Sequence, residues 1–316
     1  GDFPNGGLTS LHHAARENSI ESAQLLLAAG ANPSILDPQG ISPLRVAATN
    51  KNLDFAKLLI ESGADLSDGS LVDIMEIPYK RFEFEYAASN YENTTTVEEL
   101  TILMMELDAD IDATSETGIP YFSTGFVGVS GTSGQTALYN ASLGDRFADV
   151  ELLLEHGANP NSVSSEGNTP LSAVLNVYAG FKPADPTRDK SIEPTFEEKM
   201  PIVNVLFASG ADVNTLAEDG SSILHHAASL GNDEVVELLL EHGINLSLKD
   251  DSNRTALDVA SGVPEIGAEL EMMNGEVQNT ETPIYEITMA ILTEAMNSQG
   301  VAIEEYMAPA SGKDEA

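Results

Sequence analysis

Apolar and polar positions recur along the chain with a period of 33 residues. The stretch GLTSLHHAARENSIESAQLLLAAGANPS begins at Gly7, and the similar stretch GISPLRVAATNKNLDFAKLLIESGADLS begins at Gly40. Related stretches begin at Gly134 and Gly220, and in all four a second glycine follows 23 residues after the first. A fixed period of this length is the signature of a protein built from stacked structural repeats.

Each unit predicts two short helices joined by a turn. A threonine or serine near the start of the unit is the expected N-cap, and Pro43 and Pro170 occupy the favoured first helical position. Paired alanines such as Ala14 and Ala15 keep the first helix thin, and the second helix ends on a glycine suited to a left-handed cap. One such unit cannot bury its apolar face alone, so the units must stack. The expected N-caps are Thr9, Ser42, Thr136, Thr169, Ser222 and Thr255.

Three motifs of the chain resemble the ankyrin repeat: TPL at 169–171, LHHAA at 11–15 and 224–228, and LLLEHGANPN at 152–161. The resemblance implies an all-α repeat solenoid of stacked helix-turn-helix ankyrin repeats, with β-hairpin fingers along one edge. We expect one solenoid over residues 1–307 and a disordered tail at 308–316. The expected units are 4–36, 37–67, about 68–113, 114–161, 162–214, 215–247 and 248–307.

Two of these units are irregular. In the third, FEYAAS at 84–89 matches LRVAAT at 44–49, which predicts a first helix there, and Asp108 replaces the capping glycine. In the last, a long acidic insert precedes the expected second helix at 283–298, which is expected to form the C-terminal cap.

The candidate chemical groups have structural explanations. The resemblance implies that His12 and His225 bond to the backbone of the neighbouring turn. His156 and His242 fall in the last turn of a second helix, where a cation or polar cap is favourable. The motif DADID at 108–112 lacks the glycine and glutamate that a calcium loop needs at its sixth and twelfth positions. We therefore expect no enzyme activity, no metal site and no cofactor.

The chain is strongly acidic, with 51 acidic and 14 basic residues and a net charge of −37. Such a surface repels nucleic acid and anionic lipid, and it attracts a basic protein. The alternative is that the charge serves solubility in a salty or extracellular habitat. There is no cysteine and no apolar run long enough to span a membrane, so neither a disulfide nor membrane insertion is expected. The irregular repeats and low lysine content favour a bacterial source, with a secreted or periplasmic location over a cytoplasmic one.

Three insertions supply the candidate partner-binding residues, because a repeat protein tolerates extra residues only in loops. From Asp108 to the next repeat glycine the chain runs 26 residues instead of 10, giving a long finger with no charged residue between Glu116 and Gly134. The third unit carries a rare basic pair flanked by aromatic residues, and the fifth unit is longer between its helices, where Lys199 and other basic residues lie. The candidates are Tyr121, Phe122, Phe126 and Val127, then Tyr79, Lys80, Arg81 and Phe82, then Phe181 and Lys182.

These features predict a non-catalytic recognition module that binds a protein partner through its fingers, concave face and inserted loops. We expect it to be a monomer when free. Two alternatives stay open: an inhibitor or self-protection protein that blocks the active site of a basic enzyme, and a structural subunit of a larger assembly. The inserted loops could also pack on the solenoid instead of contacting a partner.

Overall fold

The computed structural model describes residues 8–75, 93–114, 134–165, 167–175, 195–262 and 285–303, together with the backbone of four short strands. Its helices are α1 (Ser10–Arg16), α2 (Ile20–Ala28), α3 (Pro43–Thr49), α4 (Leu53–Glu61), α5 (Ser70–Met75), α6 (Val97–Glu106), α7 (Ala137–Leu143), α8 (Phe147–Glu155), α9 (Pro170–Val174), α10 (Phe196–Ala208), α11 (Ile223–Leu230), α12 (Asp233–Glu241), α13 (Ala256–Ala260) and α14 (Glu286–Gln299).

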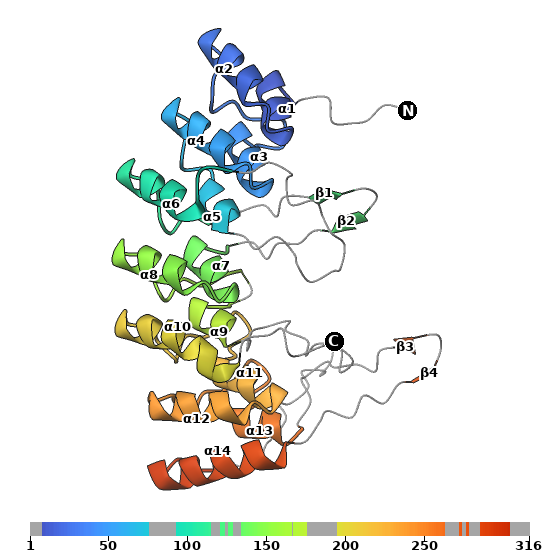
Figure 1. Cartoon of the computed structure of the whole chain (residues 1–316). Coiled ribbons are helices and arrows are strands. Elements are labelled where there is room, and N and C mark those ends of the chain that lie inside the picture. The colour runs from blue at the N-terminus through green and yellow to red at the C-terminus, as the bar shows by residue number, and fades with distance from the viewer. Residues whose placement is uncertain are drawn as a thin grey trace, which may run out of the picture. The chain divides into compact units, whose positions relative to one another are not determined.

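The helices form antiparallel pairs that stack in chain order within each of two compact units, residues 1–165 and 166–316 (Figure 1). In the first unit α1 packs on α2 and α3, α3 on α4 and α5, and α5 on α6 and α7. In the second, α11 packs on α12 and α13, and α14 covers both α12 and α13. The predicted all-α repeat solenoid is therefore confirmed, while its extent as one domain over 1–307 stays a prediction.

The helix starts confirm the expected caps. All six predicted threonines and serines occupy N-cap positions. At Ser42 the side-chain oxygen accepts the backbone N–H of Arg45 at 3.0 Å, and Pro43 stands at the first helical position. The alanine pairs behind these caps are buried, which lets neighbouring first helices approach closely.

The second helices end in a left-handed turn. After α2, Gly30 has φ +88° and its N–H donates to Leu27, while Ala31 donates to the carbonyl of Leu26 at 3.0 Å. These two bonds satisfy carbonyls that the helix itself leaves unpaired. Asp108 makes the same pair of bonds after α6 with φ +58°, so the replaced glycine keeps its conformation although an L-residue is strained there.

Side chains beyond each cap tie adjacent repeats together. The N–H of Asp65 donates to Ser34 Oγ of the repeat before it at 2.8 Å, and Asn159 donates in the same way to Asp112 Oδ1 at 2.9 Å. Asp110 also accepts the N–H of Asp112, closing a tight turn. The DADID motif is thus a repeat junction, as expected, and its acidic side chains serve the backbone.

The third repeat contains a helix that was not expected from the sequence. Helix α5 packs between α3 and α7, in the place of a first helix. The helix predicted at 84–89 lies outside the described residues. The insert of this repeat consequently falls between its two helices. In the seventh repeat the predicted second helix is confirmed as α14.

Two short hairpins accompany the helices. Strands β1 (Tyr121–Ser123) and β2 (Phe126–Gly128) pair antiparallel within the long finger, with Phe122 opposite Val127. Strands β3 (Met272–Met273) and β4 (Glu276–Val277) pair within the insert of the seventh repeat.

Candidate interaction surface

The predicted partner-binding residues fall where side chains are not described. Tyr79, Lys80, Arg81 and Phe82 lie outside the described residues, as do Phe181 and Lys182. Of the finger candidates, only the backbone is described: Tyr121 pairs with Gly128, and Ser123 pairs with Phe126. Their role in binding stays a prediction. What the structure does describe is the place where each insert leaves the helices and rejoins them, which we call the insert base.

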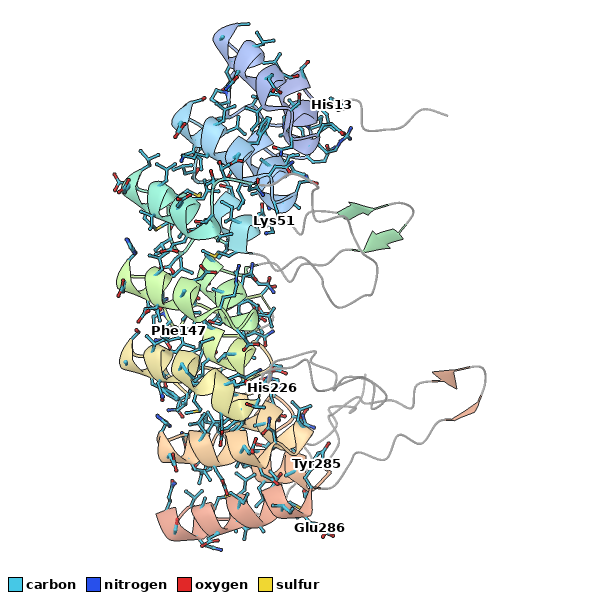
Figure 2. All side chains as sticks on the ribbon, viewed as in Figure 1. His13, Lys51, Phe147, His226, Tyr285 and Glu286 are labelled. Carbon is cyan, nitrogen blue, oxygen red and sulfur yellow. The ribbon has the colours of Figure 1, made fainter. Side chains whose placement is uncertain are left out.

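The insert of the third repeat begins at the end of α5, where cations hold three successive carbonyl groups. Lys51, in the turn between α3 and α4, donates from Nζ to the carbonyls of Asp73 at 2.6 Å and Ile74 at 3.0 Å. Arg146, from the fourth repeat, donates to the carbonyl of Met75. A cation at this end of a helix meets unpaired carbonyls and the negative end of the helix dipole. Figure 2 marks Lys51 beside α5.

The same insert ends on the other side of that turn. Asn93 donates from Nδ2 to the carbonyl of Lys51 at 2.8 Å and accepts the N–H of Leu53 at 3.0 Å. Next, the carboxylate of Asp54 accepts the N–H groups of Thr94 at 2.9 Å and Thr95 at 2.8 Å. Burial alone raises the pKa of Asp54, but these hydrogen bonds outweigh it and lower the pKa. Both ends of the 76–92 segment are therefore fixed to residues 51–54.

The fifth repeat closes its insert base with a single side chain. Lys199 belongs to α10, the helix that resumes after the insert, and its Nζ donates to the carbonyl of Val174 at the end of α9, at 2.8 Å. Lys199 is buried. Sequence reasoning had grouped this lysine with the cations of the inserted loop, so that placement was wrong: the residue is part of the scaffold.

The seventh repeat closes its base through the backbone. The N–H of Tyr285, just before α14, donates to the carbonyl of Ala260 at the end of α13, at 2.9 Å. The Tyr285 ring lies against Gly231, where a Cβ would come within 2.2 Å of the ring (Figure 2 labels Tyr285). In all three repeats with an insert between the helices, the described residues thus bring its two ends together.

Closed insert bases matter for recognition. The entropy of bringing loop ends together is already spent in folding, so that part of the ordering cost does not recur on binding. Sequence reasoning missed Lys51, Asn93 and Arg146, since their partners lie 22, 42 and 71 residues away. One feature of the sequence could have pointed to Lys51. It stands in the turn between the two helices of its repeat, where the other repeats carry Asn18, Asp145 and Gly231.

The ordinary fingers expose apolar side chains at one recurring position. Leu36 and Val163 in the first unit, and Leu216 in the second, each stand six residues after a capping glycine. They are 57%, 43% and 43% exposed. Singly exposed apolar residues are common on protein surfaces, so the feature that distinguishes these three is their recurrence at the same position of the repeat.

Several described cations are directed into the protein. Arg45 pairs with Asp73 and Arg254 with Asp250, all four being buried, while Lys51, Arg146 and Lys199 bond to carbonyls of their own chain. Since few bases remain to offset the 51 acidic residues, the charge available at the surface is predominantly negative.

His12 and His225 behave as the ankyrin resemblance implied, and His156 and His242 lie at helix ends as expected. Nε2 of His12 donates to the carbonyl of Ile41 at 2.9 Å, and Nε2 of His225 donates to Arg254 at 3.0 Å. His156 and His242 each bond through Nδ1 to a carbonyl of the last helical turn, at 2.9 Å. Within the described residues, no three histidine, aspartate or glutamate side chains form a group that could hold a metal ion.

Comparison with known families decides the classification. The model of ankyrin repeats (3 copies) matches residues 2–69 and 195–273, and the ankyrin repeat model matches 133–165. The chain belongs to the ankyrin-repeat family. The unmatched middle segments, 70–132 and 166–194, contain the long finger and the inserts of the third and fifth repeats, which explains why the family pattern is interrupted there.

The curated relatives contain ankyrin-like stretches similar to this chain, and the chain spans less than half of their length. The chain is 29% identical over 204 residues to the mouse B-cell lymphoma 3 protein homolog, covering 65% of this chain and 36% of that protein. It is 33% identical over 197 residues to the human ankyrin repeat and SOCS box protein 16, covering 54% of this chain and 41% of that protein. The crystal structure of the human ASB11 ankyrin repeat domain matches 90% of this chain and 98% of its own, with a TM-score of 0.52 and 17% identity, and so supports the fold.

These results establish the chain as an ankyrin-repeat protein-interaction module, a fold and family that are generally non-catalytic. Among the described helices, none is long and apolar enough to cross a membrane.

Proposed function

We propose that the chain binds one protein partner through its fingers and inserts, and that this partner is basic. The observation that carries the proposal is the exposed apolar residue at the same position of three fingers, Leu36, Val163 and Leu216. Burying these side chains against a partner would remove apolar surface from water, which favours association. The negative surface would steer a basic partner toward them.

The inserts extend this surface. The closed insert bases support a role for Tyr79 to Phe82, for Phe181 and Lys182, and for the aromatic finger at Tyr121 to Val127, because a loop with fixed ends loses less entropy when it binds. The chain is proposed to be monomeric when free, and a bacterial, secreted or periplasmic setting is proposed with it.

The proposal is tested by capturing partners from an extract of the source organism. One variant carries Leu36→Ser, Val163→Ser and Leu216→Ser. A matched control carries Leu25→Ser, Leu107→Ser and Ile287→Ser, which are exposed apolar residues on helices or helix ends, at 74%, 50% and 68%. We expect the finger variant to lose a basic protein that the control retains. Equal capture by both variants would show that the fingers are not the binding surface.

Two further experiments distinguish this proposal from the alternative functions. A wash at high salt releases a partner held by charge, and deletion of 119–130 tests the long finger. The alternative function, inhibition of a basic enzyme, predicts that stoichiometric addition of the chain abolishes the activity of the captured protein. A structural subunit predicts that the complex survives high salt.

A further inference from the structure

We propose that the outer side of α2 is a second docking surface, which binds an apolar α-helix of another protein. This surface, called here the end face, consists of Leu25 and Leu26. Among the described residues no helix precedes α1, and α2 lies at the end of the first unit (Figure 1). The inference goes beyond the proposed function, since the end face is separate from the fingers and recognises apolar surface instead of charge. The bound helix would lie on α2 as α2 lies on α4.

The first observation is that Leu25 is exposed where its counterparts are covered. In the first six repeats the second helix carries an apolar residue five positions before its left-handed cap residue. Leu25 is 74% exposed at this position, whereas Leu238 is 6% exposed and the remaining counterparts are half-buried. The counterparts are Leu58, Leu103, Leu152, Val205 and Leu238.

The next position along the helix repeats the contrast. Leu26 is half-buried, whereas no counterpart is more than 3% exposed. Ala23 is the only residue of α2 that is buried, and α4 buries five of its residues. The structure itself shows what covers such positions, because α2 packs on α4. The first repeat therefore presents an interior type of surface that has no second helix upon it. The counterparts of Leu26 are Leu59, Met104, Leu153, Leu206, Leu239 and Met296.

Helix α14 shows how a terminal repeat differs in sequence. Three positions before the cap residue, Phe207 faces the following repeat and stacks on His242 with ring centroids 3.8 Å apart. The counterpart of Phe207 in α14 is Asn297, which is polar and exposed. A repeat array needs such a polar outer face where it meets solvent. Helix α2 has no polar replacement at Leu25 or Leu26, so its outer side is suited to a partner.

The charge of α2 determines the chemistry of that partner. Helices α4, α6 and α8 each carry three charged residues, and α2 carries one, Glu21. The exposed residues near Leu25 are Ser22, Gln24 and Ala28, which are uncharged. A basic segment finds little attraction here. A helix with apolar residues at i, i+3 and i+4 removes both leucines from water and can approach closely over the small side chains.

The first experiment supplies a defined helix pair to the end face. A copy of residues 221–253, which contains α11 and α12, is inserted directly before Leu8 of the full chain. The insertion keeps the 33-residue period, so the added α12 sequence is held beside α2 at a high effective concentration. We expect hydrogen exchange of the α2 amides, measured by mass spectrometry, to slow about tenfold or more, because a covered helix opens less often.

Two variants of the extended chain make this result specific. Leu25→Asp places a charge in the end face and should restore the exchange rates of the unextended chain. Leu107→Asp is the matched control at the end of α6, where the leucine is 50% exposed, and it should leave the slower exchange intact. Both leucines are exposed, so circular dichroism should show unchanged helical content. Exchange that the added repeat does not slow, or that stays slow with Leu25→Asp, would overturn the end face.

The second experiment identifies the natural occupant with the unextended chain. The photoreactive amino acid p-benzoylphenylalanine replaces Ala28, which is exposed one helical turn from Leu25, and the chain is irradiated in an extract of the source organism. We expect a cross-link to a peptide of another protein with apolar residues at the helical spacing i, i+3, i+4 and i+7. Leu25→Asp should lower the yield about tenfold, since burying one leucine is worth about a factor of ten or more in affinity.

The cross-link is distinguished from finger binding by one comparison. The variant with Leu36→Ser, Val163→Ser and Leu216→Ser should keep the cross-link, and high salt should not weaken it, because the contact is apolar. If capture of the basic protein does not depend on the fingers while the cross-link is kept, the proposed function fails and the end face stands. No cross-link, a cross-link to a second copy or to the chain's own residues, a peptide without that apolar spacing, or a yield unaffected by Leu25→Asp would each overturn the end face.

Discussion

The guanidinium of Arg45 holds the carboxylate of Asp73 at two points inside the first unit, Nε to Oδ2 at 2.8 Å and Nη2 to Oδ1 at 3.3 Å. Both side chains are buried. Burial raises the pKa of Asp73, and the bond and charge of Arg45 oppose that rise. The pair joins α3 to α5, the helix that leads into the third-repeat insert, so a buried charge stands where the repeat pattern is least regular.

Removing one partner of this pair should cost far more than removing both. We expect Arg45→Met to lower the free energy of unfolding by about 3–5 kcal/mol, because it leaves a carboxylate buried without its cation. The double variant Arg45→Met with Asp73→Leu should regain most of that loss. Urea unfolding followed by circular dichroism measures both.

The loss in Arg45→Met should also depend on pH. Without the guanidinium, the pKa of Asp73 in the folded state rises further above its ordinary value of 3.8. A raised folded pKa means that the folded state binds the extra proton, so stability is retained below pH 3.8 and falls as the pH increases through the folded pKa. A penalty that is the same at acid and neutral pH would contradict this account.

Asp108 offers a stabilising substitution. Asp108 has a φ of +58°, and the equivalent position of other repeats carries glycine, for example Gly63 with a φ of +82°. An L-residue there costs about 1–2 kcal/mol, and part of this should be recovered by Asp108→Gly, which also removes one negative charge. The reverse change, Gly63→Asp, serves as the matched control and should destabilise by a similar amount. Thermal unfolding of both variants decides the sign.

Gly231 is required for a different reason. A Cβ at this position would lie 2.2 Å from the Tyr285 ring, whereas a Cβ at Gly30 would have nothing within 4 Å, although φ is positive at both. Gly30→Ala should therefore cost only the conformational strain, about 1–2 kcal/mol. Gly231→Ala adds overpacking of about 1–3 kcal/mol, which the second change Tyr285→Ala should relieve. If the two alanine variants are equally stable, the ring contact contributes nothing.

Much of the scaffold was predictable because its determinants are local. The N-caps, the left-handed glycines and the histidine bond to the next turn all sit at fixed offsets within a 33-residue period, so one clear repeat defines the others. Even α14 was predicted, since its apolar spacing survives the insert before it.

The insert bases were not predictable, because they depend on contacts between distant residues. Nothing in the neighbourhood of Lys199 shows that its ammonium meets Val174, and nothing near Arg146 shows that it reaches Met75. Helix α5 was not predicted for a related reason: its sequence, SLVDIM, carries neither the alanine pair of α1 nor the proline of α3, and its place as a first helix follows from its packing between α3 and α7.

His225 should make the second unit sensitive to acid. Burial lowers the pKa of His225 below its ordinary value of 6.5, and its neutral ring donates to the carbonyl of Arg254 while Nδ1 faces the N–H of Ser222 at 3.1 Å. A depressed folded pKa means that the unfolded state binds the proton first, so stability is fully present above pH 6.5 and is lost as the pH falls toward the folded pKa.

This dependence can be isolated by substitution. His225→Gln should flatten the fall in unfolding free energy on the acid side of neutrality, at the cost of lower stability at neutral pH, because the ring no longer joins Ser222 to Arg254. His13 is exposed on α1, so His13→Gln should leave the slope unchanged. Urea midpoints across this pH range measure the slope for each variant. If the slope of unfolding free energy against pH is unaltered in His225→Gln, other groups cause the acid sensitivity. If the slope is flattened, His225, which joins adjacent repeats, is the group that limits their stability in acid.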